Sequence, residues 1–145
     1  MVRDLRRKAC AESVGRYDAR MRTAVAIALA GALGALARWG VGAWFGQRFP
    51  TFPWGTIVIN VSGSLVLGVL FALLVERGIG SPTMRLALMT GLLGAYTTFS
   101  TFSLETFRLL EDGAVRPALA NVGLSVVLGL VAVWIGVVAG RAVWS

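Results

Sequence analysis

Histidine is absent from this chain of 145 residues, cysteine occurs once, and only 14% of the residues are charged. These absences exclude a Cys/His metal site and an internal disulfide, and they leave Cys10 as a lone thiol in the N-terminal tail. A soluble domain carries roughly 25% charged residues, whereas this chain is 57% apolar with a mean hydropathy of +0.75. The composition predicts a membrane protein.

Long uncharged stretches make up most of the chain. Three of them, Pro53–Val75, Leu86–Leu104 and Pro117–Gly140, reach about 20 residues, the length that an α-helix needs to cross a membrane. A fourth, Thr23–Phe45, is interrupted only by Arg38. We therefore expect an all-α membrane protein with four transmembrane helices, near 23–45, 53–76, 83–110 and 117–141.

Residues 1–22 form a basic N-terminal extension ahead of this transmembrane domain of residues 23–145. The extension holds seven Lys/Arg and three acidic residues. Such a segment binds nucleic acid in some proteins, but beside a membrane helix it is typical of a segment that contacts anionic lipids and stays in the cytoplasm. We favour the second interpretation and expect no nucleic acid partner. Translation from Met21, which would remove most of the extension, is an alternative.

The charges outside residues 1–20 give the four helices little preference for one orientation. One side of the membrane would hold four arginines and the other three, and the Lys/Arg difference is what orients helices. This balance favours insertion in both orientations and an antiparallel dimer, whereas the basic extension favours a cytoplasmic N-terminus; both outcomes stay open. Small residues four apart, such as Ser64 with Gly68 and Gly136 with Gly140, indicate close helix packing.

The segment Gly91–Ser103 combines glycines with a dense run of hydroxyl side chains inside the third predicted helix. One interpretation is a helix broken near the middle of the membrane, whose freed carbonyl oxygens face protein, water or a cation such as Na⁺. The other is a continuous Ser/Thr-rich helix whose hydroxyls bond back to its own carbonyls. The residue types alone do not separate the two.

An aromatic pair lies within the same segment. Phe99 and Phe102 are three residues apart and so share a helix face. Two such rings on a membrane helix are usually packing or lipid contacts, but the positive edge of a ring can also hold a dehydrated anion. Ser100 and Thr101 would supply hydroxyl donors beside it.

Other polar groups lie within the predicted helices. Asn60 is deep in the second helix, where an unpaired amide is costly, and Asn121 and Ser125 share a face of the fourth. Each fits an ordinary interhelical hydrogen bond or a polar track of donors. Arg38 either reaches the interface or concentrates anions at a pore mouth. Glu105 closes the uncharged stretch on the face of the phenylalanine pair.

The groups that active transport and catalysis need are missing. No acidic residue lies deep in a predicted helix, so a proton-coupled carrier lacks its titrating group. No phosphate-binding loop is present, and no nucleophile–base pair can be assembled. We therefore expect no enzymatic activity, and passive conduction of a small anion fits what remains.

Four strings carry a more specific signal: Gly31–Trp39, Pro53–Gly63, Gly91–Phe102 and Asn121–Ser125. Together they resemble the Fluc (CrcB-type) fluoride channels over residues 26–141. The resemblance implies a fluoride-selective passive channel in the bacterial plasma (inner) membrane, which exports cytoplasmic fluoride for detoxification. It also implies an antiparallel, dual-topology homodimer with two pores.

The same resemblance implies roles for residues already singled out. Arg38 would lie in the vestibule and Glu105 near the end of the pore, while the backbone carbonyls of Gly94 and Thr97 would hold a structural Na⁺ at the dimer axis. The fluoride pore would be lined by Phe99, Phe102, Asn60, Ser100, Thr101 and Ser125.

The chain departs from that family at three places. Gly129 stands where a hydroxyl is common, Asn121 stands where a tyrosine is common, and the extension before Met21 is additional. Two other classes compete. A small dual-topology multidrug exporter should have a deep carboxylate in its first helix, where this chain has Arg38. A membrane scaffold without transport would use the basic extension to bind a partner.

Overall fold

The computed structural model describes the backbone of residues 2–143 and the side chains of residues 15–143. The side chain of Cys10 and those of the first basic residues lie outside this part. Helices are the only regular elements of residues 2–143, which confirms the all-α prediction. They are α1 (Val2–Arg48), α2 (Trp54–Leu70), the π-helical η1 (Phe71–Glu76), α3 (Pro82–Arg85), the π-helical η2 (Leu86–Leu93), α4 (Gly94–Tyr96), α5 (Phe99–Glu111) and α6 (Val115–Ala142).

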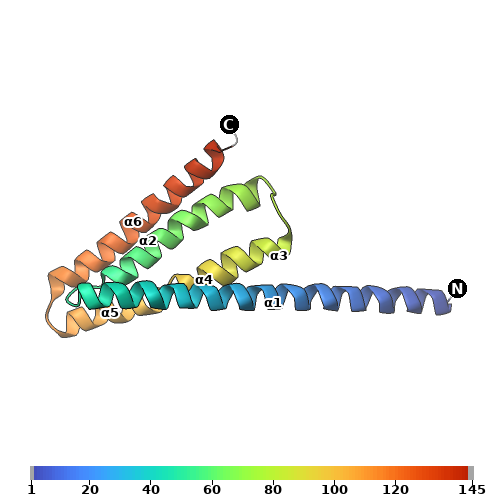
Figure 1. The fold of residues 1–145 in the computed structure, drawn as a ribbon, viewed down its shortest axis with the longest axis horizontal. Helices are drawn as coiled ribbons and strands as arrows, with labels where there is room; N and C mark the ends of the chain where they lie inside the picture. The colour runs from blue at the N-terminus through green and yellow to red at the C-terminus, as the bar shows by residue number, and fades with distance from the viewer. Residues whose placement is uncertain (1, 144–145) are drawn as a thin grey trace.

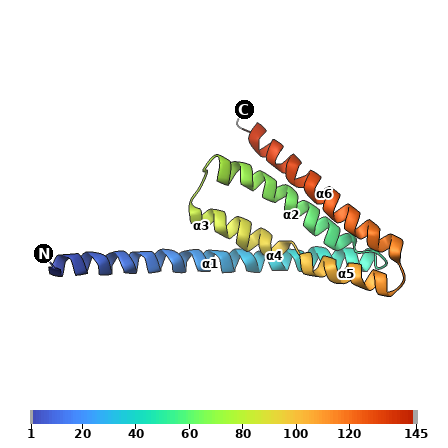
Figure 2. The ribbon, with the colours of Figure 1, turned by 180° about the vertical axis from the view of Figure 1, so that it is seen from behind.

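The helices run back and forth along one direction and form a small bundle. In Figure 1, α2 and α6 lie side by side, and α3 and α4 lie alongside α1. The N-terminal end of α1, the connection before α3 and the C-terminal end of α6 lie towards one end; the α1–α2 and α5–α6 connections lie at the other, also when seen from behind (Figure 2). The bundle therefore has the up-and-down order of a multi-pass membrane protein.

Helix α1 is longer than the expected 23–45, because it begins at Val2 without a break at Met21. Its part suited to a membrane, Gly15–Arg48, has 34 residues, or about 50 Å at 1.5 Å per residue, against a hydrocarbon layer of about 30 Å. Residues 2–22 contain no proline, so nothing in them stops the helix. As a result, the N-terminal part projects well beyond the other helices (Figure 1).

Three helical stretches of the described chain are long and apolar enough to cross a membrane: Gly15–Arg48, Trp54–Glu76 and Val115–Ala142. The third predicted helix, 83–110, is instead divided among α3, η2, α4 and α5. Between α4 and α5, Thr97 and Thr98 have extended backbone, with ψ of 158° and 116°. The chain therefore contains a non-helical dipeptide next to the phenylalanine pair.

Glycines set the distance between helices. A Cβ atom on Gly136 would overlap the carbonyl oxygen of Leu65 and lie 3.1 Å from Cα of Gly68. A Cβ atom on Gly34 of α1 would likewise overlap the carbonyl oxygen of Leu92. Gly68 and Gly136, two of the small residues that the sequence indicated for close packing, thus allow close contact between helix backbones. At the end of this contact, Arg141 Nε donates to Glu76 Oε2 at 2.9 Å.

Candidate functional site

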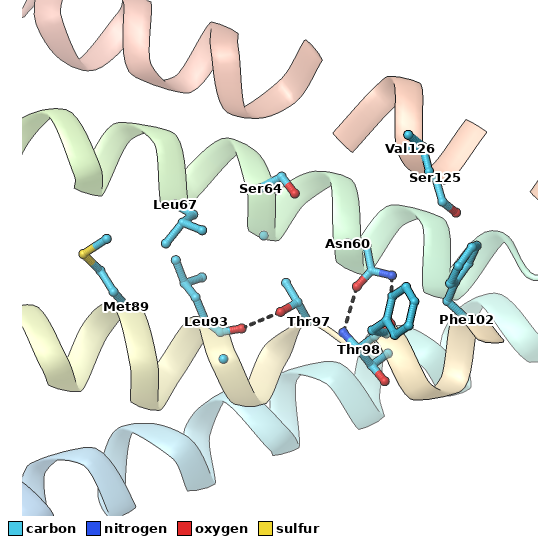
Figure 3. A pocket seen from close by; sticks show the side chains of 13 residues that line it. Asn60, Ser64, Leu67, Met89, Leu93, Thr97, Thr98, Phe102, Ser125 and Val126 are labelled. Carbon is cyan, nitrogen blue, oxygen red and sulfur yellow. Dashed lines mark hydrogen bonds between the residues drawn. The ribbon is translucent and has the colours of Figure 1, made fainter. Parts of the chain in front are cut away.

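The extended dipeptide is held by a side chain from another helix. The amide of Asn60 in α2 forms two hydrogen bonds with the backbone of Thr98: Asn60 Nδ2 donates to the Thr98 carbonyl at 3.0 Å, and Thr98 N–H donates to Asn60 Oδ1 at 2.8 Å. Figure 3 shows the Asn60 side chain directed at this backbone. The cost of unpaired backbone groups at the break is thereby reduced.

The break also releases two carbonyl oxygens. In a continuous helix, the Thr98 and Thr101 amides would donate to the carbonyls of Gly94 and Thr97. Here Thr98 N–H donates to Asn60, and Thr101 N–H donates to Thr98 Oγ1 at 3.2 Å. Gly94 is exposed, so its carbonyl is within reach of an ion or a second protein chain.

These two carbonyls are the ones that the resemblance to the Fluc family implies as Na⁺ ligands. Carbonyl oxygens are hard ligands of the kind that such cations take. The described residues contain no group of three or more His, Cys, Asp or Glu side chains that could hold a metal instead. The donor set at the break therefore fits Na⁺ chemically.

A cavity of about 350 Å³ lies beside the break, between α2, α5, α6 and the segment before Thr97. It brings together four of the predicted pore residues, Asn60, Phe99, Phe102 and Ser125. Figure 3 labels three of them, Asn60, Phe102 and Ser125. The two rings lie 5.6 Å apart between centroids, at 44°. The remaining lining residues are Gly63, Ser64, Leu67, Met89, Leu93, Gly94, Thr97, Thr98 and Val126.

The phenylalanine rings differ in exposure. Phe99 is 79% exposed in the single chain, whereas Phe102 is half-buried. The cavity therefore has a wall on the α2 and α6 side and an uncovered edge at Phe99.

The other predicted pore residues line a second, wider hollow of about 1010 Å³. Arg38, Ser100, Thr101 and Glu105 belong to it, together with the aromatic connection between α1 and α2. Thr98 lines both hollows, so its backbone lies where the two meet. The structure thus divides the predicted site into two hollows that share one residue.

Glu105 is held at the wider hollow by a residue that the sequence did not single out. Thr56 Oγ1 donates to Glu105 Oε1 at 2.9 Å. Glu105 Oε2 is buried and has no hydrogen bond partner within residues 15–143. Thr56 carries no sequence signal beyond its hydroxyl, because the contact spans 49 positions.

Asn121 and Ser125 share a face of α6 but have different surroundings. Asn121 is fully buried and donates through Nδ2 to Thr106 Oγ1 at 2.8 Å, while Thr106 Oγ1 donates to the Phe102 carbonyl at 2.8 Å. Ser125 lines the smaller cavity, and its hydroxyl has no partner in the described structure. Asn121 therefore positions the turn that carries Phe102, while Ser125 faces the cavity.

Comparison with known proteins identifies relatives along most of the chain. Residues 25–137 match the family model described as CrcB-like protein, Camphor Resistance (CrcB). The chain is 48% identical over 118 residues to a protein of Acidobacterium capsulatum (81% of this chain and 94% of the relative). It is 50% identical over 122 residues to one of Chloroflexus aurantiacus (83% and 97%). A third, from Hydrogenovibrio crunogenus, is 43% identical over 125 residues (83% and 92%).

Each of these three relatives is named a fluoride-specific ion channel, FluC. With the three apolar spans, these relatives confirm the prediction of a multi-pass bacterial membrane protein. They also confirm the prediction that the chain is no enzyme, because these relatives are named as ion channels. The family match and the relatives together show that the chain belongs to the CrcB-like family.

Proposed function

We propose that this chain forms a fluoride-selective channel through which fluoride leaves the cytoplasm passively. The observation that carries the proposal is the 350 Å³ cavity, in which the phenylalanine pair faces Asn60 and Ser125 beside the break at Thr98. The relatives named as fluoride-specific channels support the choice of ion.

The cavity offers an anion neutral groups only. Asn60 Nδ2 carries two N–H groups; one bonds the Thr98 carbonyl, which leaves the other for an ion. Ser125 adds a hydroxyl without a protein partner, and the ring edges of Phe99 and Phe102 add weak positive potential. Such groups replace water around a small anion without binding it as strongly as a fixed positive charge would.

The wider hollow is the proposed mouth of the path. Arg38 and Arg108 line it and raise the local concentration of anions. Ser100 and Thr101 continue from there to Thr98, where the narrower cavity begins. Glu105, bonded to Thr56, lies along this approach.

The proposed unit is an antiparallel homodimer of chains with opposite orientation, with two pores. The 79% exposure of Phe99 supports it, because a second copy would cover the open edge of the cavity. Gly94 is exposed as well, so carbonyls of Gly94 and Thr97 from both copies can surround one Na⁺ at the axis. The third segment, Pro82–Glu111, would cross the membrane as a broken helix and complete four spans.

The cellular role follows from acid–base chemistry. HF crosses membranes in acid surroundings, ionises in the cytoplasm and leaves fluoride trapped there. A passive anion path lets the membrane potential, negative inside, drive fluoride out, and this fits the absence of a coupling group in the sequence.

The test is efflux from liposomes that contain the purified protein. Fluoride inside the vesicles should leave rapidly when a potential is applied, and chloride should leave far more slowly under the same conditions. Equal rates for both ions would disprove selectivity, and fluoride efflux no faster than from empty liposomes would disprove the channel.

A further inference from the structure

The hydroxyl of Ser64 lines the smaller cavity and has no role in the fluoride path described so far. Ser64 lies one turn after Asn60 on α2, so the two side chains share a helix face. Gly129 of α6 lies next to it: a Cβ atom on Gly129 would lie 3.8 Å from Ser64 Oγ, at ordinary contact distance. Figure 3 shows Ser64 on α2 between Leu67 and Asn60.

Several hydroxyls among the described residues behave differently from that of Ser64. Ser62 donates to the Val58 carbonyl at 2.6 Å, Ser103 to the Phe99 carbonyl at 2.9 Å, and Thr106 to the Phe102 carbonyl at 2.8 Å. This bond to the preceding turn is the usual way to satisfy a hydroxyl in a membrane helix. Ser64 forms no hydrogen bond within the described residues, although the Asn60 carbonyl lies one turn before it.

Its position extends the polar side of the cavity. Along α2, Ser64 lies one turn, about 5.4 Å, beyond Asn60 and towards the end lined by Leu67, Leu93 and Met89. At this level α6 has no side chain to offer, because Gly129 follows Ser125 by one turn. Thr97 also lines the cavity, but its hydroxyl donates to the Leu93 carbonyl at 2.9 Å.

We propose that Ser64 is a further fluoride-coordinating residue, which donates its hydroxyl to the ion at the level where α6 carries Gly129. The inference rests on the proposed function, since the anion in the cavity is fluoride. The competing explanation is that Ser64 is only a small residue that lets α2 approach α6. Alanine would serve that purpose equally well.

The experiment moves the hydroxyl from one helix to the other. Fluoride efflux from liposomes is measured for the wild type, for Ser64→Ala, and for two double variants that combine Ser64→Ala with Gly129→Ser or with Gly129→Ala. Position 129 can take a Cβ, because its nearest contact of 3.8 Å is an ordinary van der Waals distance. The two double variants differ by one oxygen atom, so packing is matched.

We expect Ser64→Ala to lower fluoride efflux by about tenfold or more, as for loss of a hydrogen bond to a charged partner. Adding Gly129→Ser should recover most of the rate, while adding Gly129→Ala should not. Gel filtration of each variant should give the wild-type elution volume, which excludes misfolding as the cause.

Three results would overturn the proposal. They are an unchanged rate for Ser64→Ala, equal rates for the two double variants, and a loss of rate that accompanies aggregation in Ser64→Ala. In each case a rapid wild-type efflux would leave the proposed channel function intact. If the wild type showed no fluoride efflux, both the proposed channel function and the proposed role of Ser64 would be disproved.

Discussion

At the scale of single residues, Asn60 connects the polar interior with the backbone. Both polar atoms of its amide bond to Thr98, so the same side chain supports the break and offers a donor to the cavity. An amide is the group that fits here, because it donates and accepts through two adjacent atoms. A carboxylate of equal size can accept only.

Replacing Asn60 by Asp should therefore damage both stability and transport. The carboxylate would face the Thr98 carbonyl without a proton, which costs about 1–3 kcal/mol, and its negative charge would repel fluoride. We expect fluoride efflux to fall more than about tenfold, together with a lower melting temperature. Thr23→Val, which removes a hydroxyl bonded to Ala19 and Thr83 outside the cavity, is the control. Unchanged fluoride efflux in Asn60→Asp would show that Asn60 does not contact the ion along the proposed path.

The exposed phenylalanine gives a second test at this scale. Phe99→Ile keeps the residue apolar but removes the ring edge, so fluoride efflux should fall more than about tenfold. The dimer should persist by gel filtration. Phe107→Ile is the matched control, since Phe107 is also on α5 and 56% exposed but lines neither hollow. Equal efflux in the two variants would contradict a role for the Phe99 ring.

At the scale of helices, the contact between α2 and α6 depends on Gly68 and Gly136. Each would place a Cβ atom against the backbone of the other helix, so the helices can approach only without side chains there. Because α2 carries Asn60 and α6 carries Ser125, this contact sets the width of the cavity.

Widening the contact should disturb the protein as a whole. Gly136→Ala should destabilise it by about 1–3 kcal/mol, because the new methyl group meets the Leu65 carbonyl rather than a movable side chain. Gly123→Ala, on the same helix with nothing within 4 Å of its Cβ position, should change stability by less than about 1 kcal/mol. Thermal unfolding in detergent measures both, and equal midpoints would contradict the packing argument.

The sequence predicted the helical class and three of the spans because uncharged runs of that length leave few alternatives in a membrane. It also indicated Thr97 and Thr98 as part of a weak stretch, but it left a broken and a continuous helix open. The deciding contact joins Asn60 to Thr98, 38 positions apart, and spacing cannot reveal such a partner. The sequence did not predict the length of α1, because the charge of residues 1–22 is typical of an extension beside a membrane, whereas Arg and Lys also form helices well.

The division of the site into two hollows was likewise beyond the sequence. Ser100 and Thr101 follow Phe99 directly, yet they line the wider hollow while Phe99 lines the cavity. Which side each faces depends on the turn that follows the extended Thr98, whose hydroxyl accepts from Thr101 N–H and begins α5. The local sequence does not tell how far this turn rotates the side chains of Phe99, Ser100 and Thr101 about the axis of α5.

At the scale of the whole molecule, the extension of α1 bears on orientation. Outside Arg38, the N-terminal side of the bundle holds ten Lys/Arg and the other side three; without residues 1–20 the balance is four to three. An antiparallel dimer needs both orientations, so we expect the full chain and a chain that begins at Met21 both to insert both ways, with the extension raising the share of chains whose N-terminus is cytoplasmic. Accessibility of a C-terminal tag from each side of the membrane measures this. Equal labelling of the full chain from both sides would show that the extension does not orient it.

Sodium removal tests the assembly. If carbonyls of Gly94 and Thr97 from two copies share one Na⁺, exchange of Na⁺ for a large organic cation should lower fluoride efflux, and added Na⁺ should restore it. The carbonyls belong to the backbone, so the Na⁺ requirement should survive Thr97→Val. Full efflux after exhaustive removal of Na⁺ would contradict a structural ion at this place.

The two bonds between Asn60 and Thr98 also link conduction to completion of the fold. Because no neighbour in sequence supplies these partners for Thr98, we expect the turn that begins with Phe99 to be fixed in direction only after α2 has docked against it. A newly inserted copy whose helices have not yet met thus has no assembled passage for ions. Immature copies should accumulate in the membrane without dissipating its voltage.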